Sequence, residues 1–312
     1  MRVFRYKINQ KLPFDECVLA LGLFDGVHIA HRDLLSCAKE RARGAGIPFG
    51  IFTFSAEDSF KTNSPRLYST DEKLKLFERC DADFVIIADF ASLSTLTPSE
   101  FVKTVLIKEL GCRICVAGFN FRFGHRASGN ADDLARFMSE NGGEAIIRDE
   151  LTFNNSTVST TRIRALIADG KISEANLLLG APYFISGKVT HGNSKGKHLG
   201  FPTANTSFTE NELIPKIGVY RTAIPIGEKI YCAITNIGVC PTFDSRPVHA
   251  ETYIIDFNSD IYNDDVEIYL LEYLREERRF NSEKELIMQI NVDKNIAIKK
   301  NGDITWQKLG LK

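Results

Sequence analysis

The first half of the chain alternates short apolar runs with segments in which apolar residues recur every three or four positions. Short runs of this kind predict buried strands, and the longer period predicts helices with one apolar face. Such alternation is typical of a parallel sheet covered by helices, so we expect an α/β domain. The expected strands are 17–21, 48–54, 84–87, 113–117 and 145–147.

Two of the expected helices carry clear start signals. Ser69 is followed three residues later by Glu72, and Thr97 by Glu100, which is the spacing of the capping box. Pro98 follows Thr97 at the first helical position, where proline is favoured. Both helices are therefore predicted to begin at these residues.

The pattern changes after residue 155. Two short helices are expected over 159–169 and 173–179, each ended by a glycine. From residue 182, β-rich runs recur between turns rich in Gly, Pro and Asn, which predicts a small antiparallel barrel with one last helix opened at Ser282. The expected strands are 184–190, 219–224, 230–235, 251–257 and 267–273.

These patterns predict two domains. The first covers residues 1–180 and includes a helical connector at about 157–180, and the second, mainly β, covers residues 181–312. A length of 312 residues, 44% of them apolar and 25% charged, is enough for two hydrophobic cores.

Charge and cysteine content exclude several classes of protein. The 39 basic and 40 acidic residues balance, so neither nucleic acid nor a membrane surface is expected as a partner. No apolar run reaches the ~20 residues of a spanning helix, and the start lacks a signal-peptide core, so we expect a cytoplasmic protein. Seven scattered cysteines do not form a secreted disulfide framework. The Cys112 and Cys115 pair has no second pair at zinc spacing, so buried thiols are expected there in preference to a metal or redox site.

A glycine-bounded turn joins the first buried run of residues 17–21 to a helix. Such a turn points backbone N–H groups and the positive helix end at a crevice, which suits a phosphate. His28 and His31, three residues apart, share one helical face and can hydrogen-bond the charge that builds on phosphorus during nucleotidyl transfer. The alternative is a capped helix with surface histidines. The turn residues expected to bind nucleotide are Gly22, Phe24, Asp25 and Gly26.

Two further segments suit the same ligand. Residues 118–124 combine Asn120 with Phe121 and Phe123, a composition that can stack a flat ring and hydrogen-bond it, with core packing as the alternative. Residues 159–164 place hydroxyls and arginines at a helix start, which is a second anion-binding end. The residues expected to act there are Ser159, Thr160 and Arg162.

Residues 191–205 are the most informative stretch of the second half. A Walker A loop is excluded, because three residues separate the glycines and His198 follows Lys197. Glycines and lysines can still cradle a polyphosphate, and Thr203 and Asn205 can offer Mg²⁺ two oxygen ligands from one face of an extended segment. A basic surface hairpin is the alternative. The residues expected to hold the phosphates are Gly192, Lys195 and Lys197.

These motifs resemble two enzyme families in turn. The Gly-x-Phe-Asp-Gly-Val-His at 22–28 resembles the bacterial FAD synthetase branch of the HxGH nucleotidyltransferases. The Gly-Phe-Pro-Thr-Ala-Asn at 200–205, with the later Gly-Val-Tyr, Asn-Ile-Gly and Pro-Thr-Phe at 218–220, 236–238 and 241–243, is similar to the riboflavin kinase domain. The resemblance covers roughly residues 15–300 and implies a bifunctional riboflavin kinase and FAD synthetase.

The resemblance implies a reaction sequence and residue roles. Riboflavin and ATP would give FMN and ADP, and FMN and a second ATP would give FAD and pyrophosphate, with Mg²⁺ as cofactor. Thr203 and Asn205 would bind metal and phosphates, and Glu251 would be the base on the flavin hydroxyl. Without the resemblance, the alternative for Glu251 is an ordinary solvated glutamate on a strand. The further flavin contacts implied are Tyr220, Arg275 and Phe280.

Three positions depart from the family pattern. Ala30 stands in place of a glycine, Thr53-Phe54 leads to Ser55-Ala56-Glu57 where the family carries a Pro-His-Pro, and Tyr262-Asn263-Asp264 replaces Tyr-Gly-Lys. The first two bear on adenylyl transfer. A monofunctional riboflavin kinase with a weakened first domain therefore stays open as an alternative, as does a flavin-sensing binding protein.

Overall fold

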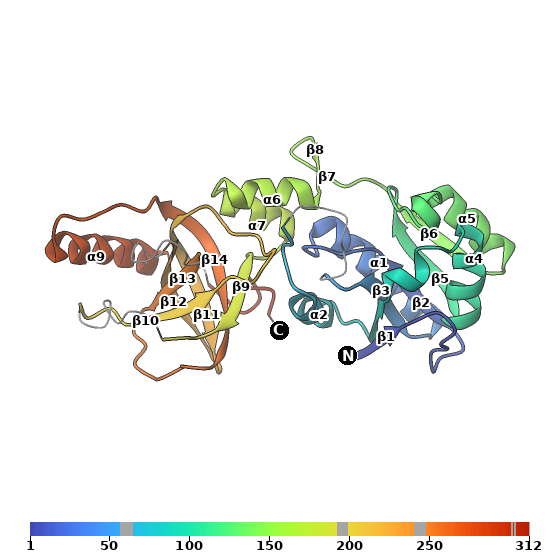
Figure 1. Ribbon diagram of the computed structural model, residues 1–312, viewed down its shortest axis with the longest axis horizontal. Coiled ribbons are helices and arrows are strands. Elements are labelled where there is room, and N and C mark those ends of the chain that lie inside the picture. The colour runs from blue at the N-terminus through green and yellow to red at the C-terminus, as the bar shows by residue number, and fades with distance from the viewer. Residues whose placement is uncertain (57–64, 192–198, 240–247, 301, 303, 312) are drawn as a thin grey trace. The chain divides into compact units, whose positions relative to one another are not determined.

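In the computed structural model the chain forms two compact units, Met1–Thr160 and Thr161–Lys312 (Figure 1). The structure describes residues 1–56, 65–191, 199–239, 248–300, 302 and 304–311. The expected fold class is confirmed: a parallel α/β unit precedes an antiparallel near-barrel with a terminal helix. The division between the two units, judged by their internal contacts, falls at the start of the two connector helices. A functional domain boundary at residue 180 stays a prediction.

The first unit is built on a six-stranded parallel sheet in the order β1-β4-β3-β2-β5-β6. Its strands are β1 (Arg2–Tyr6), β2 (Cys17–Leu21), β3 (Phe49–Phe54), β4 (Phe84–Ala88), β5 (Cys112–Gly118) and β6 (Glu144–Arg148). Five match the expected strands, while β1 was not expected. It lies at the sheet edge, and Arg2 and Arg5 interrupt its apolar residues, so it lacks the continuous apolar run of a central strand.

Helices follow most of these strands. They are α1 (Ile29–Ala45), α2 (Thr70–Arg79), α3 (Phe90–Leu93), α4 (Pro98–Glu100), the π-helix η1 (Phe101–Glu109), the 3₁₀ turn η2 (His125–Ala127) and α5 (Ala131–Glu140). Both expected capping boxes are present, at the starts of α2 and α4. Helix α1 packs against β2, β3 and β5. A short ribbon of β7 (Thr152–Phe153) and β8 (Ser156–Thr157) ends the unit.

The strand order creates a topological switch point. Strand β2 lies between β3 and β5, and the chain continues from β2 to β3 on one side and returns to β5 on the other. In open α/β sheets, ligands bind beyond the carboxyl ends of strands at such a point. The turn 22–28 and the loop 118–124 both begin there, at the ends of β2 and β5.

The second unit is built on a six-stranded antiparallel sheet in the order β10-β13-β12-β11-β14-β9. Its strands are β9 (Phe184–Lys188), β10 (Thr203–Ser207), β11 (Gly218–Ile226), β12 (Lys229–Gly238), β13 (His249–Ile254) and β14 (Asp265–Arg275). A bridge between Thr190 and Asn205 connects the two ends of this order, so the sheet nearly closes. Buried Thr222, Thr235 and Thr252 form a chain of hydroxyl contacts of 2.9 Å each on its inner face.

The described helices that accompany this sheet are α6 (Thr160–Ala168), α7 (Ile172–Leu179) and α9 (Glu283–Lys299). Asn176 fixes α7 to the barrel, because its amide donates to the Leu270 carbonyl at 2.9 Å and accepts from the Tyr183 N–H at 2.8 Å. Gly170 and Gly180 have positive φ after α6 and α7, as expected of helix-ending glycines.

Candidate active sites

The turn between β2 and α1 holds strained backbone. Gly26 has a φ of +90°, and Phe24 and Val27 have φ values of +51° and +42°. Such values are uncommon without glycine and costly for a β-branched residue, so they persist only where the surroundings hold them. Gly22 allows the ring of Phe24 to fold back, since a Cβ there would lie 3.0 Å from that ring. The turn thus has a fixed shape beside the positive end of α1.

The structure brings the two histidines together at the start of α1. His28 caps the helix, and its Nδ1 accepts a hydrogen bond from the His31 backbone N–H at 3.3 Å. Their rings stack with centroids 3.6 Å apart and planes 12° apart. The ring of Phe24, itself 1% exposed, meets His31 edge-on at 5.3 Å. Any contact between Phe24 and a nucleotide would therefore use its backbone.

Burial keeps both imidazoles neutral. It lowers the pKa of His28 to about 4 and that of His31 well below its usual range, and the charges of His28 and Lys73 lower the His31 pKa further. A neutral imidazole has one donor and one acceptor nitrogen. Within the described residues, the buried Nδ1 of His31 has no hydrogen-bond partner. The pair can thus hydrogen-bond phosphate oxygens without a net charge of its own.

This burial predicts a pH dependence of stability. We expect the free energy of unfolding of the first unit to fall as the pH drops from about 6.5 towards 4, because unfolded His28 takes up a proton near pKa 6.5 and folded His28 does not. For a full shift of this size the loss is on the order of 3 kcal/mol. Urea unfolding followed by circular dichroism at several pH values measures it. His28→Asn keeps a capping side chain and should flatten the slope, and an unchanged slope would contradict the prediction.

A buried lysine lies at the end of β3, where the family's Pro-His-Pro is missing. Lys73 on α2 is 4% exposed, and its Nζ donates to Thr53 Oγ1 and the Phe54 carbonyl, both at 3.2 Å. Thr53 Oγ1 in turn donates to the Leu23 carbonyl of the turn at 3.1 Å. Lys73 is not among the site residues expected from the sequence, although its spacing from the buried Leu76 places it on the inner face of the helix.

The segment before α6 reaches the same turn. Thr160 Oγ1 donates to the Asp25 carbonyl at 3.0 Å, and Asp25 Oδ1 accepts from the Leu67 N–H at 3.2 Å. Ser159 precedes this contact and is partly buried. Arg162 belongs to the second unit, so its expected contact with nucleotide phosphates stays a prediction.

The aromatic loop after β5 divides into exposed and core residues. Asn120 is exposed in the turn, whereas Phe123 is 7% exposed and packs against Phe101 with ring centroids 5.5 Å apart. Phe121 stacks on Phe123 at 5.6 Å and is only partly buried. The alternative of core packing thus describes Phe123, and the surface available to a flat ring is that of Phe121.

In the second unit, register aligns the residues expected for the kinase reaction. Asn205 of β10 and Asn236 of β12 are both directly opposite Glu251 of β13. Directly opposed residues share one sheet face, so these three side chains form a row. Thr203 shares the face, being two residues from Asn205. Tyr220 pairs with Thr235 on the other face and is fully buried, which leaves its expected flavin contact without an exposed surface.

The oxygen donors of this row fit a hard cation. The Asn205 amide nitrogen donates to the Thr203 carbonyl at 3.2 Å, which occupies the nitrogen and leaves Oδ1 as an acceptor. Amide, hydroxyl and carboxylate oxygens are the ligands that Mg²⁺ prefers, together with substrate phosphates. Within the described ranges, no cluster of three or more His, Cys, Asp or Glu side chains is arranged to hold a metal ion.

Glu277 completes this face and belongs to the segment 275–280 that the family resemblance places beside the flavin. Its Oε1 accepts from the Asn236 amide at 2.8 Å. It also lies directly over Gly238, where an added Cβ would be 2.0 Å from that oxygen. The glycine of the Asn-Ile-Gly motif therefore leaves room for a carboxylate to reach the row.

The segment 275–280 is held by helix α9. Arg275 Nη2 donates to the buried carboxylate of Asp293 at 2.9 Å, and Gln289 donates to the same carboxylate at 2.8 Å. The guanidinium carbons of Arg275 and Arg278 lie 5.9 and 4.8 Å from the ring centre of Phe280. The expected flavin contacts Arg275 and Phe280 are thus adjacent and anchored. The expected phosphate residues Gly192, Lys195 and Lys197 lie outside the described residues.

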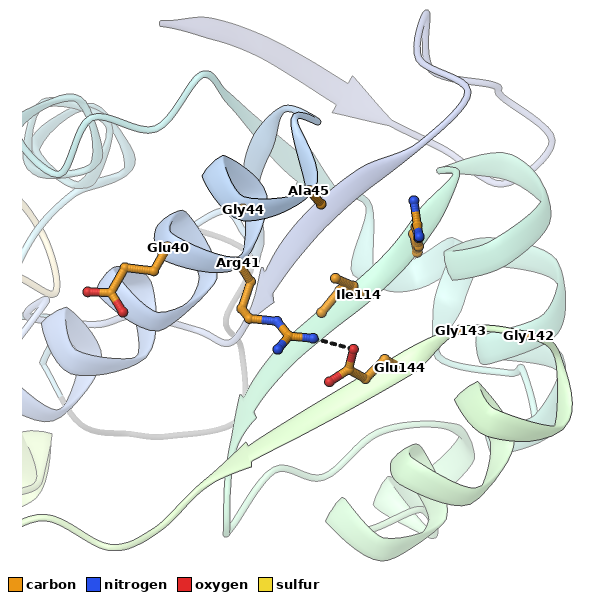
Figure 2. A pocket seen from close by; sticks show the side chains of 9 residues that line it. Glu40, Arg41, Gly44, Ala45, Ile114, Gly142, Gly143 and Glu144 are labelled. Carbon is orange, nitrogen blue, oxygen red and sulfur yellow. Dashed lines mark hydrogen bonds and ion pairs between the residues drawn. The ribbon is translucent and has the colours of Figure 1, made fainter.

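A cavity of about 510 Å³ lies in the first unit (Figure 2). It opens between the end of α1 and the starts of β5 and β6, at the opposite end of the strands from the turn 22–28. Its charged side chains include Arg41, which points at and pairs with Glu144 in Figure 2. The cavity therefore takes no part in the candidate site.

The cysteines and the apolar character of the helices concern the chain as a whole. Cys112 and Cys115 are buried free thiols within β5, as expected, and Cys240 lies outside the described residues. Over the part of the chain that the structure describes, no helix combines the length and apolar character needed to cross a bilayer.

The two sites define a two-domain transferase that acts on phosphate groups. Family models for FAD synthetase and riboflavin kinase match residues 11–162 and 179–300. A bifunctional riboflavin kinase/FMN adenylyltransferase of Listeria monocytogenes is 34% identical over 88% of this chain and 90% of its own, and that of Bacillus subtilis is 32% identical over 90% and 92%. The chain belongs to this bifunctional family, and the resemblance in its motifs is confirmed.

A similar relative and a solved structure cover nearly all of the chain. The Escherichia coli K12 protein of the same name is 33% identical over 91% of this chain and 93% of its own. A crystal structure named as a macrolide-efflux protein from Streptococcus pneumoniae is 32% identical, with a TM-score of 0.85 over 95% of this chain and 99% of that one.

Proposed function

We propose that this chain makes FAD from riboflavin in two ATP-dependent steps. The second unit phosphorylates riboflavin to FMN, and the first unit transfers an adenylyl group from ATP to FMN and releases pyrophosphate. The observation that carries the proposal is the match of one chain to both family models, with a candidate site in each unit. A cytoplasmic location, Mg²⁺ as the metal, and no nucleic-acid or membrane partner are parts of the same proposal.

For the kinase step we assign Glu251 as general base. It takes the proton of the flavin's primary hydroxyl as that oxygen bonds to the γ-phosphorus of ATP and the bond to ADP breaks. Thr203 and Asn205 would hold Mg²⁺, which supplies charge stabilisation on the phosphate oxygens. Arg275 and Phe280 would contact the flavin, and Gly192, Lys195 and Lys197 the phosphates.

For the adenylyl transfer we assign His28 and His31 as hydrogen-bond donors to the α-phosphate. Neutral, fixed donors suit this role, because they stabilise the charge that develops in the transition state without reorganising. Gly22, Asp25 and Gly26, with Ser159 and Thr160, would line the phosphates through backbone and hydroxyl groups. Arg162 would supply a cation, Asn120 would bind nucleotide, and Phe121 would stack on the flavin.

The buried Lys73 gives this half a testable feature. We expect Lys73→Met to lower adenylyl transfer about 10-fold or more, because the substitution removes a positive charge from the end of β3 next to the phosphate turn. Steady-state rates of FAD formation from supplied FMN and ATP measure the effect. Lys75→Met, on the same helix, is the matched control, and FMN formation should be unchanged in both. If Lys73→Met formed FAD as fast as the wild type, Lys73 would have no role in adenylyl transfer.

One assay tests the proposed function. Purified protein is incubated with riboflavin, ATP and Mg²⁺, and riboflavin, FMN and FAD are separated by chromatography over time. FMN should rise first and then FAD. FMN without FAD would favour the monofunctional kinase, and unchanged riboflavin would favour a flavin-sensing protein.

A further inference from the structure

A histidine contacts the carboxylate that we assign as kinase base. His249 Nε2 lies 3.0 Å from Glu251 Oε1, and both residues belong to β13. Residues two apart in a strand project from the same face, so the contact needs no bend of the backbone. The side chains are 20% and 39% exposed, so the pair is partly shielded but open to a substrate.

His249 has a neighbour on each of the two strands that flank β13. In register, His249 is opposite Ser207 of β10 and Gly238 of β12. Gly238 offers no side chain, and the carboxylate of Glu277 lies over it. The imidazole therefore lies on the same sheet face as the row of polar groups formed by Asn205, Glu251 and Asn236, one register position away from it.

Orientation matters for a glutamate that acts as a base. The terminal torsion of glutamate is broad, so an unheld carboxylate rotates through many orientations. A reaction rate depends on the fraction of time in which the reacting atoms are aligned. An N–H of the imidazole that donates to Oε1 removes this freedom and leaves Oε2 for the substrate hydroxyl.

We propose that His249 is a positioning residue for the kinase reaction, which holds Glu251 so that its second carboxylate oxygen faces the primary hydroxyl of the flavin. This inference rests on the proposed function of Glu251. It adds a residue to the proposed kinase site, and it predicts that His249 influences turnover through Glu251 and not through substrate binding.

The test is a double-mutant cycle on FMN formation. We expect His249→Ala to lower kcat about 10-fold with KM for riboflavin and ATP changed less than about two-fold, because only the alignment of the base is lost. His249→Gln can place an amide N–H near the same carboxylate and should recover most of the rate. In a Glu251→Gln background, His249→Ala should cause no further loss.

Controls separate this inference from the proposed function. Ser207→Ala removes the exposed neighbour of His249 on β10 and should leave kcat unchanged, and circular dichroism checks that each variant folds. Wild-type turnover in His249→Ala would overturn the positioning role. An equal fold-loss in the presence and absence of Glu251 would assign His249 a structural role only. Absence of FMN formation by the wild-type protein would instead refute the kinase function.

Discussion

Glu251→Gln is expected to abolish FMN formation, with a loss of at least about 100-fold in kcat, while the protein still converts supplied FMN into FAD. A primary alcohol is a poor nucleophile at neutral pH, and a positioned general base contributes roughly 10²–10⁴-fold to such a step. Glutamine keeps the size of the side chain and removes its basicity. Glu251 lies opposite Asn205 and Asn236 on the face that carries the proposed metal ligands, and no other residue of β13 carries a carboxylate.

The measurement uses both activities of one protein sample. Rates of FMN formation are compared with rates of FAD formation from added FMN, so a loss of folding in the whole chain would appear in both. Glu267→Gln on β14 is a control of the same chemistry at a strand residue outside the row. A variant that retained FMN formation, or that lost both activities equally, would rule out Glu251 as the base of a separate kinase site.

His31→Ala is expected to have the reverse effect, with FAD formation reduced at least about 100-fold and FMN formation unchanged. Removal of one fixed donor to developing negative charge typically costs 10²–10³-fold in kcat. His31 stacks on His28, and burial keeps its imidazole neutral, so it is held in the protonation state that can donate without reorganisation. The measurement is the rate of FAD and pyrophosphate release from FMN and ATP.

The matched control for this variant is His125→Ala. His125 lies in the same unit, and its Nδ1 is 3.1 Å from the Ser94 carbonyl, away from the turn between β2 and α1. It should leave FAD formation intact. If His31→Ala retained wild-type FAD formation, or if FMN formation fell with it, the assignment of one reaction to each unit would be wrong.

The two departures from the family pattern in the first unit now have a structural setting. Ala30 lies in the first turn of α1. In the sequence it stands between His28 and His31, whose rings stack on each other. At the end of β3, where the family carries its Pro-His-Pro, Lys73 donates hydrogen bonds to Thr53 and to the Phe54 carbonyl. Adenylyl transfer by this chain therefore has a candidate cation that the motif comparison alone did not supply.

Local sequence signals were enough to predict most of the helices and strands, and to predict at which of them each motif lies. The capping boxes at Ser69 and Thr97 form as expected, because an N-cap depends on hydrogen bonds within four residues. The central strands were recognised because strands covered on both faces are continuously apolar. Strand β1 was not expected because Arg2 and Arg5 interrupt its apolar residues, and its pairing with β4 is a contact across about eighty residues.

The sequence by itself determined the family, the two folds and the candidate motifs, because glycine spacing, capping signals and motif order are local properties of the chain. Only the tertiary structure decided which of those residues share a surface. It aligned Glu251 with Asn205 and His249, buried Tyr220 and Phe123 in cores, and brought Lys73 to the phosphate turn. Strand register and core packing join residues far apart in the chain, so no local pattern can specify them.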